Sequence, residues 1–392
     1  MQVWAEVVGQ PEAVEALSDA AAAAAQIVAR TPVAAGRMTN SWLLTGPPGS
    51  GRSIAALAFA AALLCERQGC GECADCHTAR AGTHADVTLV VPQGLSIGVD
   101  GMRAIVRNAA RAPSGGRWQV VIIEDADRLT EGASNALLKA VEEPTPRTVF
   151  LLCAPSGHPD DFALTIRSRC RSVALRTPRA ADVAAVLERR DGVEPDLAAW
   201  AAAAAQEHVG RARRLARDEE ARERRAAVLA VPAAATSLGA ALRAADRLVL
   251  AAEKEATARS AELDGPERDE LATAYGAGGT GKGTAAASRG SSAALKDLER
   301  RQKSRATRTQ RDALDRALVD LAAFYRDVLI RQYCADVAPA HPDAAADVAR
   351  TAETTSREVA LRRLEAVLAC REAIELAVKP RIAVEAMVAA LV

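Results

Sequence analysis

A glycine-rich stretch at residues 46–53 contains the residue types of a phosphate-binding loop. In such loops, Gly lets backbone N–H groups surround phosphate oxygens, a Lys binds the β and γ phosphates, and a Ser or Thr holds Mg²⁺. Arg52 stands where the Lys is required, and its longer, planar side chain is a poor substitute in a tight loop. The loop therefore predicts a P-loop fold with impaired chemistry, and its candidate nucleotide-binding residues are Gly46, Gly49, Gly51, Arg52 and Ser53.

A pair of carboxylates follows the apolar run at residues 118–123. In a nucleotide-hydrolysing site, an Asp-Glu pair at this position holds Mg²⁺ and polarises the attacking water. Here the order is reversed, because Glu124 precedes Asp125. Two interpretations stay open: a degenerate metal-binding pair, or two acids that only end a strand kept for core packing.

Four of the eight cysteines lie close together, at Cys65, Cys70, Cys73 and Cys76. Four thiolates at these spacings can surround Zn²⁺ as a closed tetrahedron, which predicts a structural zinc site. His77 in place of Cys65, or a set of reduced free thiols, are the alternatives. The first residues lack the pattern of a secretory signal, so we expect a cytoplasmic protein in which a metal site fits better than disulfides.

Short apolar runs alternate with helical patterns in the first 176 residues. Because strands that alternate with helices form parallel sheets with right-handed crossovers, this order predicts an α/β domain. The first predicted strand leads directly into the glycine-rich loop, as a phosphate loop requires. The four predicted strands cover residues 41–45, 87–91, 118–123 and 148–153.

Length and charge limit the function classes. The chain has 392 residues, which is too long for one compact core and predicts two or three domains. Its 50 basic and 50 acidic residues give no net charge, whereas a dedicated nucleic-acid binder is usually basic. No run of 18 apolar residues is free of charge, so no membrane span is expected.

Helical patterns dominate after about residue 176. Residues 275–292 are rich in Gly, Ala, Ser and Thr and predict a flexible linker. The long helix expected at about 293–334 has a basic first half, which is either a solvated face or a DNA-facing surface. Its second half carries one apolar stripe that needs a partner surface, formed by Leu314, Leu318, Leu321, Tyr325 and Val328.

Several motifs together resemble bacterial clamp-loader subunits of the AAA+ class, which belong to the DNA polymerase III holoenzyme. They cover residues 1 to about 215, and their combination and order are specific to that family. The matching stretches are residues 7–10, the glycine-rich loop, the cysteine cluster, and residues 82–86, 122–130, 135–139, 142–144 and 168–170.

The resemblance implies a three-domain organisation. A RecA-like AAA+ domain at residues 1–176 with a zinc module at 65–76 would be followed by a helical lid at 177–235. An all-α collar at 236–392, with the linker near 275–292, would hold a pentameric ring. The implied partners are the delta and gamma/tau clamp-loader subunits, the sliding clamp and, through the complex, primed DNA, without a membrane.

The resemblance also implies residue roles. Arg169 would act in trans as an arginine finger in a neighbouring subunit's ATP site, and Arg213 would be the second sensor of this chain's own site. Besides Arg52 and the Glu124-Asp125 order, residues 153–155 lack the Thr that senses the γ-phosphate. These departures speak against ATP and Mg²⁺ on this chain.

The implied function is that of a mostly non-hydrolysing stator in sliding-clamp loading during DNA replication. Such a subunit belongs to a polymerase holoenzyme but has neither polymerase nor ATPase activity of its own, so its status as an enzyme stays open. One alternative is an ATP-hydrolysing, gamma/tau-like clamp-loader subunit that tolerates Arg52. Another is a lone zinc-dependent nucleic-acid-binding module.

Overall fold

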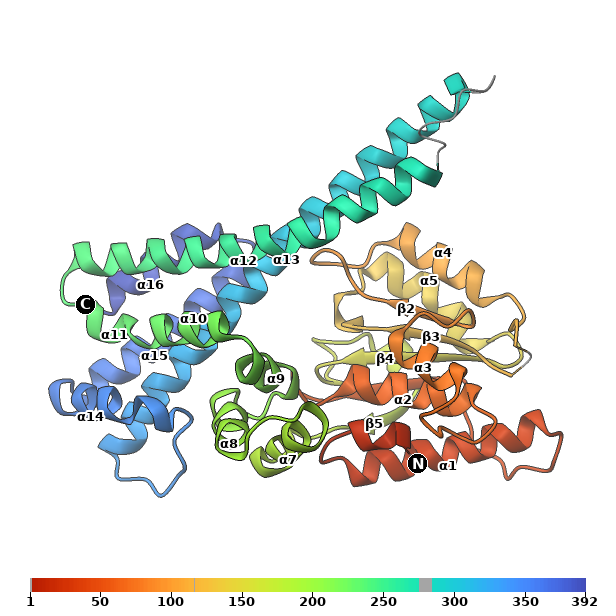
Figure 1. Ribbon diagram of the computed structural model, residues 1–392, viewed down its shortest axis with the longest axis horizontal. Helices are drawn as coiled ribbons and strands as arrows, with labels where there is room; N and C mark the ends of the chain where they lie inside the picture. Colours follow the sequence, from red (N-terminus) through yellow and green to blue (C-terminus); the bar gives the residue numbers. More distant parts are fainter. Residues whose placement is uncertain (1, 116, 275–283) are drawn as a thin grey trace. The chain divides into compact units, whose positions relative to one another are not determined.

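The computed structural model describes residues 2–115, 117–274 and 284–392. The chain divides into two compact units, Met1–Arg217 and Asp218–Val392 (Figure 1). The first unit contains the sheet. In the described residues of the second unit, the regular structure is helical. The predicted fold class, a parallel α/β domain followed by helices, is confirmed.

A five-stranded parallel sheet forms the centre of the N-terminal unit, in the order β2-β3-β4-β1-β5. All four predicted strands are present, but the edge strand β5 was missed. Three of its four residues are exposed, and Arg and Ser begin it, so the sequence shows no apolar run there. The strands are β1 Ser41–Thr45, β2 Val87–Val90, β3 Gln119–Ile123, β4 Thr148–Ala154 and β5 Arg171–Ala174.

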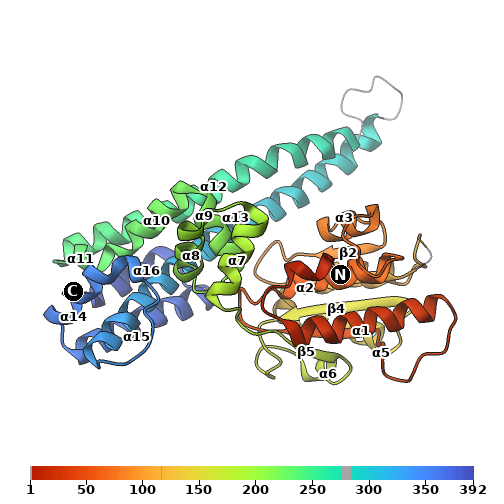
Figure 2. The same cartoon turned by 60° about the horizontal axis from the view of Figure 1, so that its bottom comes forward.

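Helices cover both faces of this sheet (Figure 2). Along β4, Leu151 and Cys153 pack into one apolar layer, whereas Phe150 and Leu152 pack into the other. Burial on both faces explains why the central strands are almost entirely apolar. The first layer contains η1 Gln2–Glu6, α1 Pro11–Val28, α2 Arg52–Leu64 and α3 Ala74–Ala81, and the second contains α4 Val99–Ala109, η2 Ala126–Arg128, α5 Glu131–Glu142 and α6 Leu164–Arg167.

Three helices that pack on one another complete the N-terminal unit: α7 Ala180–Asp191, α8 Pro195–Ala204 and α9 Val209–Arg217. We call them the α7–α9 group. Helix α9 ends at Arg217, and the chain leaves the helical conformation at Asp218. The Asp218 carboxylate accepts the backbone N–H of Ala221 at 3.2 Å and starts a new helix.

The C-terminal unit is built around the long helices α12 Leu238–Ala274 and α13 Thr284–Gln332, which run side by side (Figure 1). Helices α15 and α16 pack against this pair. The remaining helices of the unit are α10 Glu219–Leu229, α11 Val231–Ala234, η3 Pro342–Ala344, α14 Ala345–Thr354, α15 Arg357–Glu375 and α16 Pro380–Ala390.

The predicted apolar stripe of α13 belongs to the core of this same unit. Leu314, Leu318 and Leu321 are buried in one cluster with Val367 of α15 and Val384 of α16. The stripe is therefore covered by partner helices, as expected, and these helices are intramolecular. Helices α12, α15 and α16 of the same chain cover it.

The predicted linker lies partly outside the described residues, because 275–283 are not among them. Helix α13 begins at Thr284, within the predicted linker range. In the basic first half of α13, Arg305 pairs with Asp264 and Glu267 of α12, each at 2.6 Å. No helix in the described parts of either unit is long and apolar enough to cross a membrane.

Candidate nucleotide site and cysteine cluster

The glycine-rich loop connects the end of β1 to the start of α2, as the sequence predicts. Gly49 and Gly51 have left-handed backbones, with φ of 89° and 91°, which Gly adopts without strain. The N–H of Gly46 donates to the carbonyl oxygen of Pro155 at 3.2 Å, so the loop is fixed to the end of β4. The backbone therefore has the strand–loop–helix context of a phosphate site.

Arg52, the first residue of α2, folds back onto this loop. Its guanidinium donates a hydrogen bond to the carbonyl oxygen of Gly46, the first residue of the loop. Burial raises the pKa values of the nearby Cys153 and Asp127 side chains, and the positive charge of Arg52 partly opposes this rise. The side chain that replaces the phosphate-binding Lys thus has an internal partner.

His208 covers another part of the loop. A Cβ built on Gly49 would lie 2.6 Å from the His208 Cγ, so the imidazole ring packs directly against this glycine. The ring is oriented by the backbone N–H of Arg211, which donates to its Nδ1 at 3.3 Å at the start of α9. Sequence reasoning missed His208, because its only sequence signal is a position just before the helix that carries Arg213.

The two predicted acids lie at the carboxyl end of β3. The N–H of Glu124 donates to the carbonyl oxygen of Val90 at 2.9 Å, and Asp125 has a left-handed backbone with φ of 47°. Burial raises the pKa of the Cys153 thiol to about 12, and the negative charges of both carboxylates contribute to this rise. The structure therefore brings Arg52, Glu124, Asp125 and Cys153 together.

Arg213 forms its ion pair within the α7–α9 group. It contacts Asp191 Oδ1 at 2.9 Å, and the Asp191 side chain is only 1% exposed. Arg217 contacts the same oxygen at 2.9 Å. The predicted second sensor is thus held by a carboxylate at the end of α7, which the sequence did not indicate.

Arg169 lies in the turn between α6 and β5, and its side chain is 39% exposed. Its guanidinium contacts Glu142 Oε1 at 2.6 Å and donates to the carbonyl oxygen of Thr165 at 2.7 Å. Glu142 ends α5 and belongs to the motif at residues 142–144. The predicted arginine finger therefore has a carboxylate partner in its own domain.

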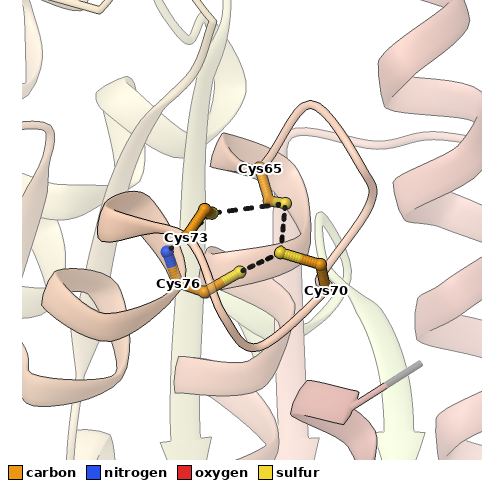
Figure 3. Close-up of side chains that lie close together, drawn as sticks. All are labelled: Cys65, Cys70, Cys73 and Cys76. Atoms are coloured by element: carbon orange, nitrogen blue, oxygen red, sulfur yellow. Dashed lines mark hydrogen bonds between the residues drawn. The ribbon is translucent and has the colours of Figure 1, made fainter.

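The four clustered cysteines converge on one point (Figure 3). Their sulfur atoms all lie within 4.8 Å of one another, so the cluster could hold a metal ion. Cys65 follows α2, Cys73 caps the start of α3, and Cys76 lies in its first turn. The predicted convergence is confirmed, and the set contains four cysteines without His77.

The thiols of this cluster differ in their surroundings. The backbone N–H of Glu72 donates to Cys70 Sγ at 3.5 Å and lowers the pKa of this thiol to about 6. Burial raises the pKa of Cys76. A metal ligand must be a thiolate, so metal binding to this cluster is expected to release protons and to weaken at low pH.

Sequence comparisons with known proteins find relatives of the part of the chain that contains the glycine-rich loop and the cysteine cluster. Residues 23–179 match the family model described as DNA polymerase III, delta subunit. The delta-prime subunit of DNA polymerase III from Pseudomonas aeruginosa is 39% identical over 148 residues, which are 36% of this chain and 44% of that protein. The N-terminal part of this chain is thus similar in sequence to DNA polymerase III delta-prime subunits.

Two further relatives, one delta-prime subunit and one tau subunit, show how much of the chain is similar. The delta-prime subunit of Escherichia coli is 35% identical over 150 residues, 37% of this chain and 44% of that protein. The tau subunit of Bacillus subtilis is 37% identical over 139 residues, 34% of this chain and 24% of that protein. The chain thus spans less than half the length of these relatives. Residues 23–179, which the family model matches, contain the glycine-rich loop, the cysteine cluster and Arg169. His208, Arg213 and the C-terminal unit lie beyond this range.

Proposed function

We propose that this chain is a clamp-loader subunit of the replicative DNA polymerase III holoenzyme, acting as a mostly non-hydrolysing stator. The observation that carries this proposal is Arg52, which replaces the phosphate-binding Lys and pairs with the carbonyl oxygen of Gly46 in its own loop. His208 against Gly49 supports it, since a phosphate in the loop would compete with the imidazole for space. The relationship to delta-prime subunits supplies the context.

In this proposal Arg169 stabilises charge on the γ-phosphoryl group in the ATP site of a neighbouring subunit. A guanidinium suits that task because its planar fork matches the negative charge spread over phosphoryl oxygens. The partners are the delta and gamma/tau subunits in a cytoplasmic pentameric ring, with residues 236–392 as the collar. The sliding clamp and primed DNA are contacted through the complex.

Reconstitution tests this proposal directly. The chain is mixed with delta and gamma/tau subunits, and complex formation is followed by size exclusion, then clamp loading onto primed DNA is measured. We expect one stable complex whose loading activity depends on this chain. Failure to enter the complex would contradict the clamp-loader assignment, whereas entry combined with ATP turnover by this chain alone would favour the gamma/tau-like alternative.

The isolated chain is expected to hydrolyse ATP no faster than a buffer blank. Arg52 is engaged with Gly46, and the reversed acids Glu124 and Asp125 are poorly arranged to bind Mg²⁺ and polarise water. Phosphate release, measured with and without Mg²⁺, checks this.

The matched variants are Arg52→Lys and Gly51→Ala. If Arg52→Lys is also inactive, the acidic pair is the deeper defect. Gly51 has φ of 91°, so Ala at this position strains the loop. Turnover by the unmodified chain that Gly51→Ala abolishes would reject the stator.

We further propose that the ion held by the cysteine cluster is structural Zn²⁺. Four sulfur ligands are typical of closed zinc sites and leave no position for a substrate or water. Purified chain is therefore expected to contain about one zinc per molecule, measured by elemental analysis. Cys73→Ala is expected to lose the zinc and to lower the melting temperature, because α3 loses its cap together with the metal.

Cys334→Ala is the control, since Cys334 is an exposed thiol outside the cluster. It should keep both the zinc and the melting temperature of the unmodified chain. Freshly prepared, reduced protein without zinc would contradict the assignment.

A further inference from the structure

The segment at residues 2–10 contacts the cysteine cluster at one end. Val3 is fully buried, and its N–H donates to the carbonyl oxygen of Gly69 at 3.3 Å. Gly69 lies between the cluster residues Cys65 and Cys70, and a Cβ on it would be 2.5 Å from the Val3 side chain. Helix η1 also packs against α2, and Val3 lies in one apolar cluster with Cys65 and Cys76, so the placement of η1 depends on the shape of the cysteine loop.

Glu6, the last residue of η1, connects this region to the α7–α9 group. Its carboxylate pairs with Arg80, which lies in α3 one turn after Cys76. The same carboxylate oxygen lies 3.7 Å from the guanidinium of Arg190, near the end of α7. One carboxylate therefore joins the cysteine helix to the first helix of the group.

The connection continues through the neighbouring Asp191. Arg190 Nε lies 3.5 Å from Asp191 Oδ1, and the same oxygen binds Arg213 and Arg217 of α9, each at 2.9 Å. The Asp191 side chain is buried, so these charge-assisted contacts are less screened by solvent than surface pairs. A shift of Arg190 would disturb the shared carboxylate that ties α7 to α9.

A second part of the same segment contacts the glycine-rich loop and the start of the group. The Gln10 amide donates to the carbonyl oxygen of Ser50 at 3.3 Å and accepts the backbone N–H of Arg176 at 2.9 Å. Gly9 packs against Pro178, to which a Cβ would approach within 3.1 Å. These contacts fix residues 9–10 without involving the cysteines, whereas Glu6 pairs with both the cysteine helix α3 and helix α7.

We infer that Glu6 is a positioning residue that makes the placement of the α7–α9 group depend on metal in the cysteine cluster. The bound ion holds the loop around Gly69 and the start of α3 in one conformation. Arg80 in α3 then positions the Glu6 carboxylate, and this carboxylate orients Arg190 in α7. Without the ion, α3 and the loop gain freedom, and the carboxylate no longer orients Arg190. This inference rests on the proposed metal site and is independent of clamp loading.

Hydrogen exchange with mass spectrometry tests the connection on the full chain. Amide exchange in α7 and α9 is compared for the zinc-loaded and the chelator-treated protein, each in the unmodified chain and in Glu6→Gln. We expect chelation to raise exchange in these helices of the unmodified chain by about two- to fivefold, the range that partly exposed ion pairs support. Zinc-loaded Glu6→Gln should show the same rise with an unchanged zinc content.

The decisive comparison is the metal dependence in the variant. In Glu6→Gln, chelation should still loosen α3 but should add nothing in α7 and α9. Arg190→Met, which removes the other end of the contact, should behave alike, and the double variant should show no further increase. Glu12→Gln is the matched control, because Glu12 forms an exposed surface pair with Arg176 and should leave exchange in α7 and α9 unchanged.

Two results would overturn the inference. One is zinc-loaded Glu6→Gln with the exchange of the unmodified chain in α7 and α9. The other is chelation that changes these helices equally in the variant and the unmodified chain, or in neither. Zinc content, measured in parallel, separates failure of the metal site from failure of the connection.

Discussion

Arg169→Ala is expected to lower the ATPase rate of a reconstituted clamp-loader complex while leaving its assembly unchanged. An arginine finger contributes about 10³–10⁵ to the rate at the one site that it completes. Other sites would continue to turn over, so the total rate should fall only partly. Clamp loading should suffer more, because it requires coordinated hydrolysis around the ring. The measurement is steady-state ATPase with clamp and primed DNA.

Glu142 provides the controls for this experiment. In the isolated chain the Glu142 carboxylate binds the Arg169 guanidinium at 2.6 Å, so any contact in trans must compete with it. Glu142→Gln weakens that competitor and is expected to keep the full ATPase rate. Arg169→Lys should resemble Arg169→Ala, because an ammonium lacks the planar fork. Equal rates for Arg169→Ala and the unmodified chain would return Arg169 to a surface role.

Leu318→Asp is expected to unfold the C-terminal unit and leave the N-terminal unit folded. Leu318 is 1% exposed in the core between α12, α13, α15 and α16. Losing a buried Leu side chain costs about 2–5 kcal/mol, and an unpaired buried carboxylate adds to that cost. A domain has only about 5–15 kcal/mol of stability to lose. Any loss of complex formation would then follow from unfolding and not from a damaged interface.

The aromatic residues allow the two units to be followed separately. All four Trp (Trp4, Trp42, Trp118 and Trp200) lie in the N-terminal unit, so tryptophan fluorescence reports its unfolding alone. Far-ultraviolet circular dichroism reports the helices of both units. Leu318→Asp should lower helicity with an unchanged fluorescence transition. Leu361→Asp, at a residue of α15 that is 47% exposed, is the control and should change neither signal.

The sequence predicted those parts of the structure that depend on local patterns. The apolar run at 148–153 marked β4, because both of its faces are buried. The spacing of Cys65 to Cys76 predicted their convergence, since the loops between them are too short to separate the thiols widely. The strand–loop–helix context at residues 41–64 placed the glycine-rich loop correctly for the same local reason.

Contacts between residues far apart in the chain could not be predicted this way. Nothing in the loop indicates that His208 packs on Gly49, or that Glu142 binds Arg169. Arg52 was recognised as unsuitable for phosphate, but its hydrogen bond to Gly46 depends on the direction in which the side chain folds. The stripe around Leu318 was recognised as apolar, but sequence periodicity cannot show whether the covering helices come from the same chain.

The order of the strands has a kinetic consequence during synthesis. Strand β1 lies between β4 and β5, so both of its neighbours in the sheet follow it in the chain. About 100 residues separate β1 from β4, and at ribosomal rates of about 5–20 residues per second their synthesis takes roughly 5–20 s. During that interval the apolar residues Trp42, Leu43 and Leu44 have no strand to pair with. The nascent chain therefore exposes these apolar residues to aggregation until residue 154 has left the ribosome, and slower translation of residues 46–147 would lengthen the exposure.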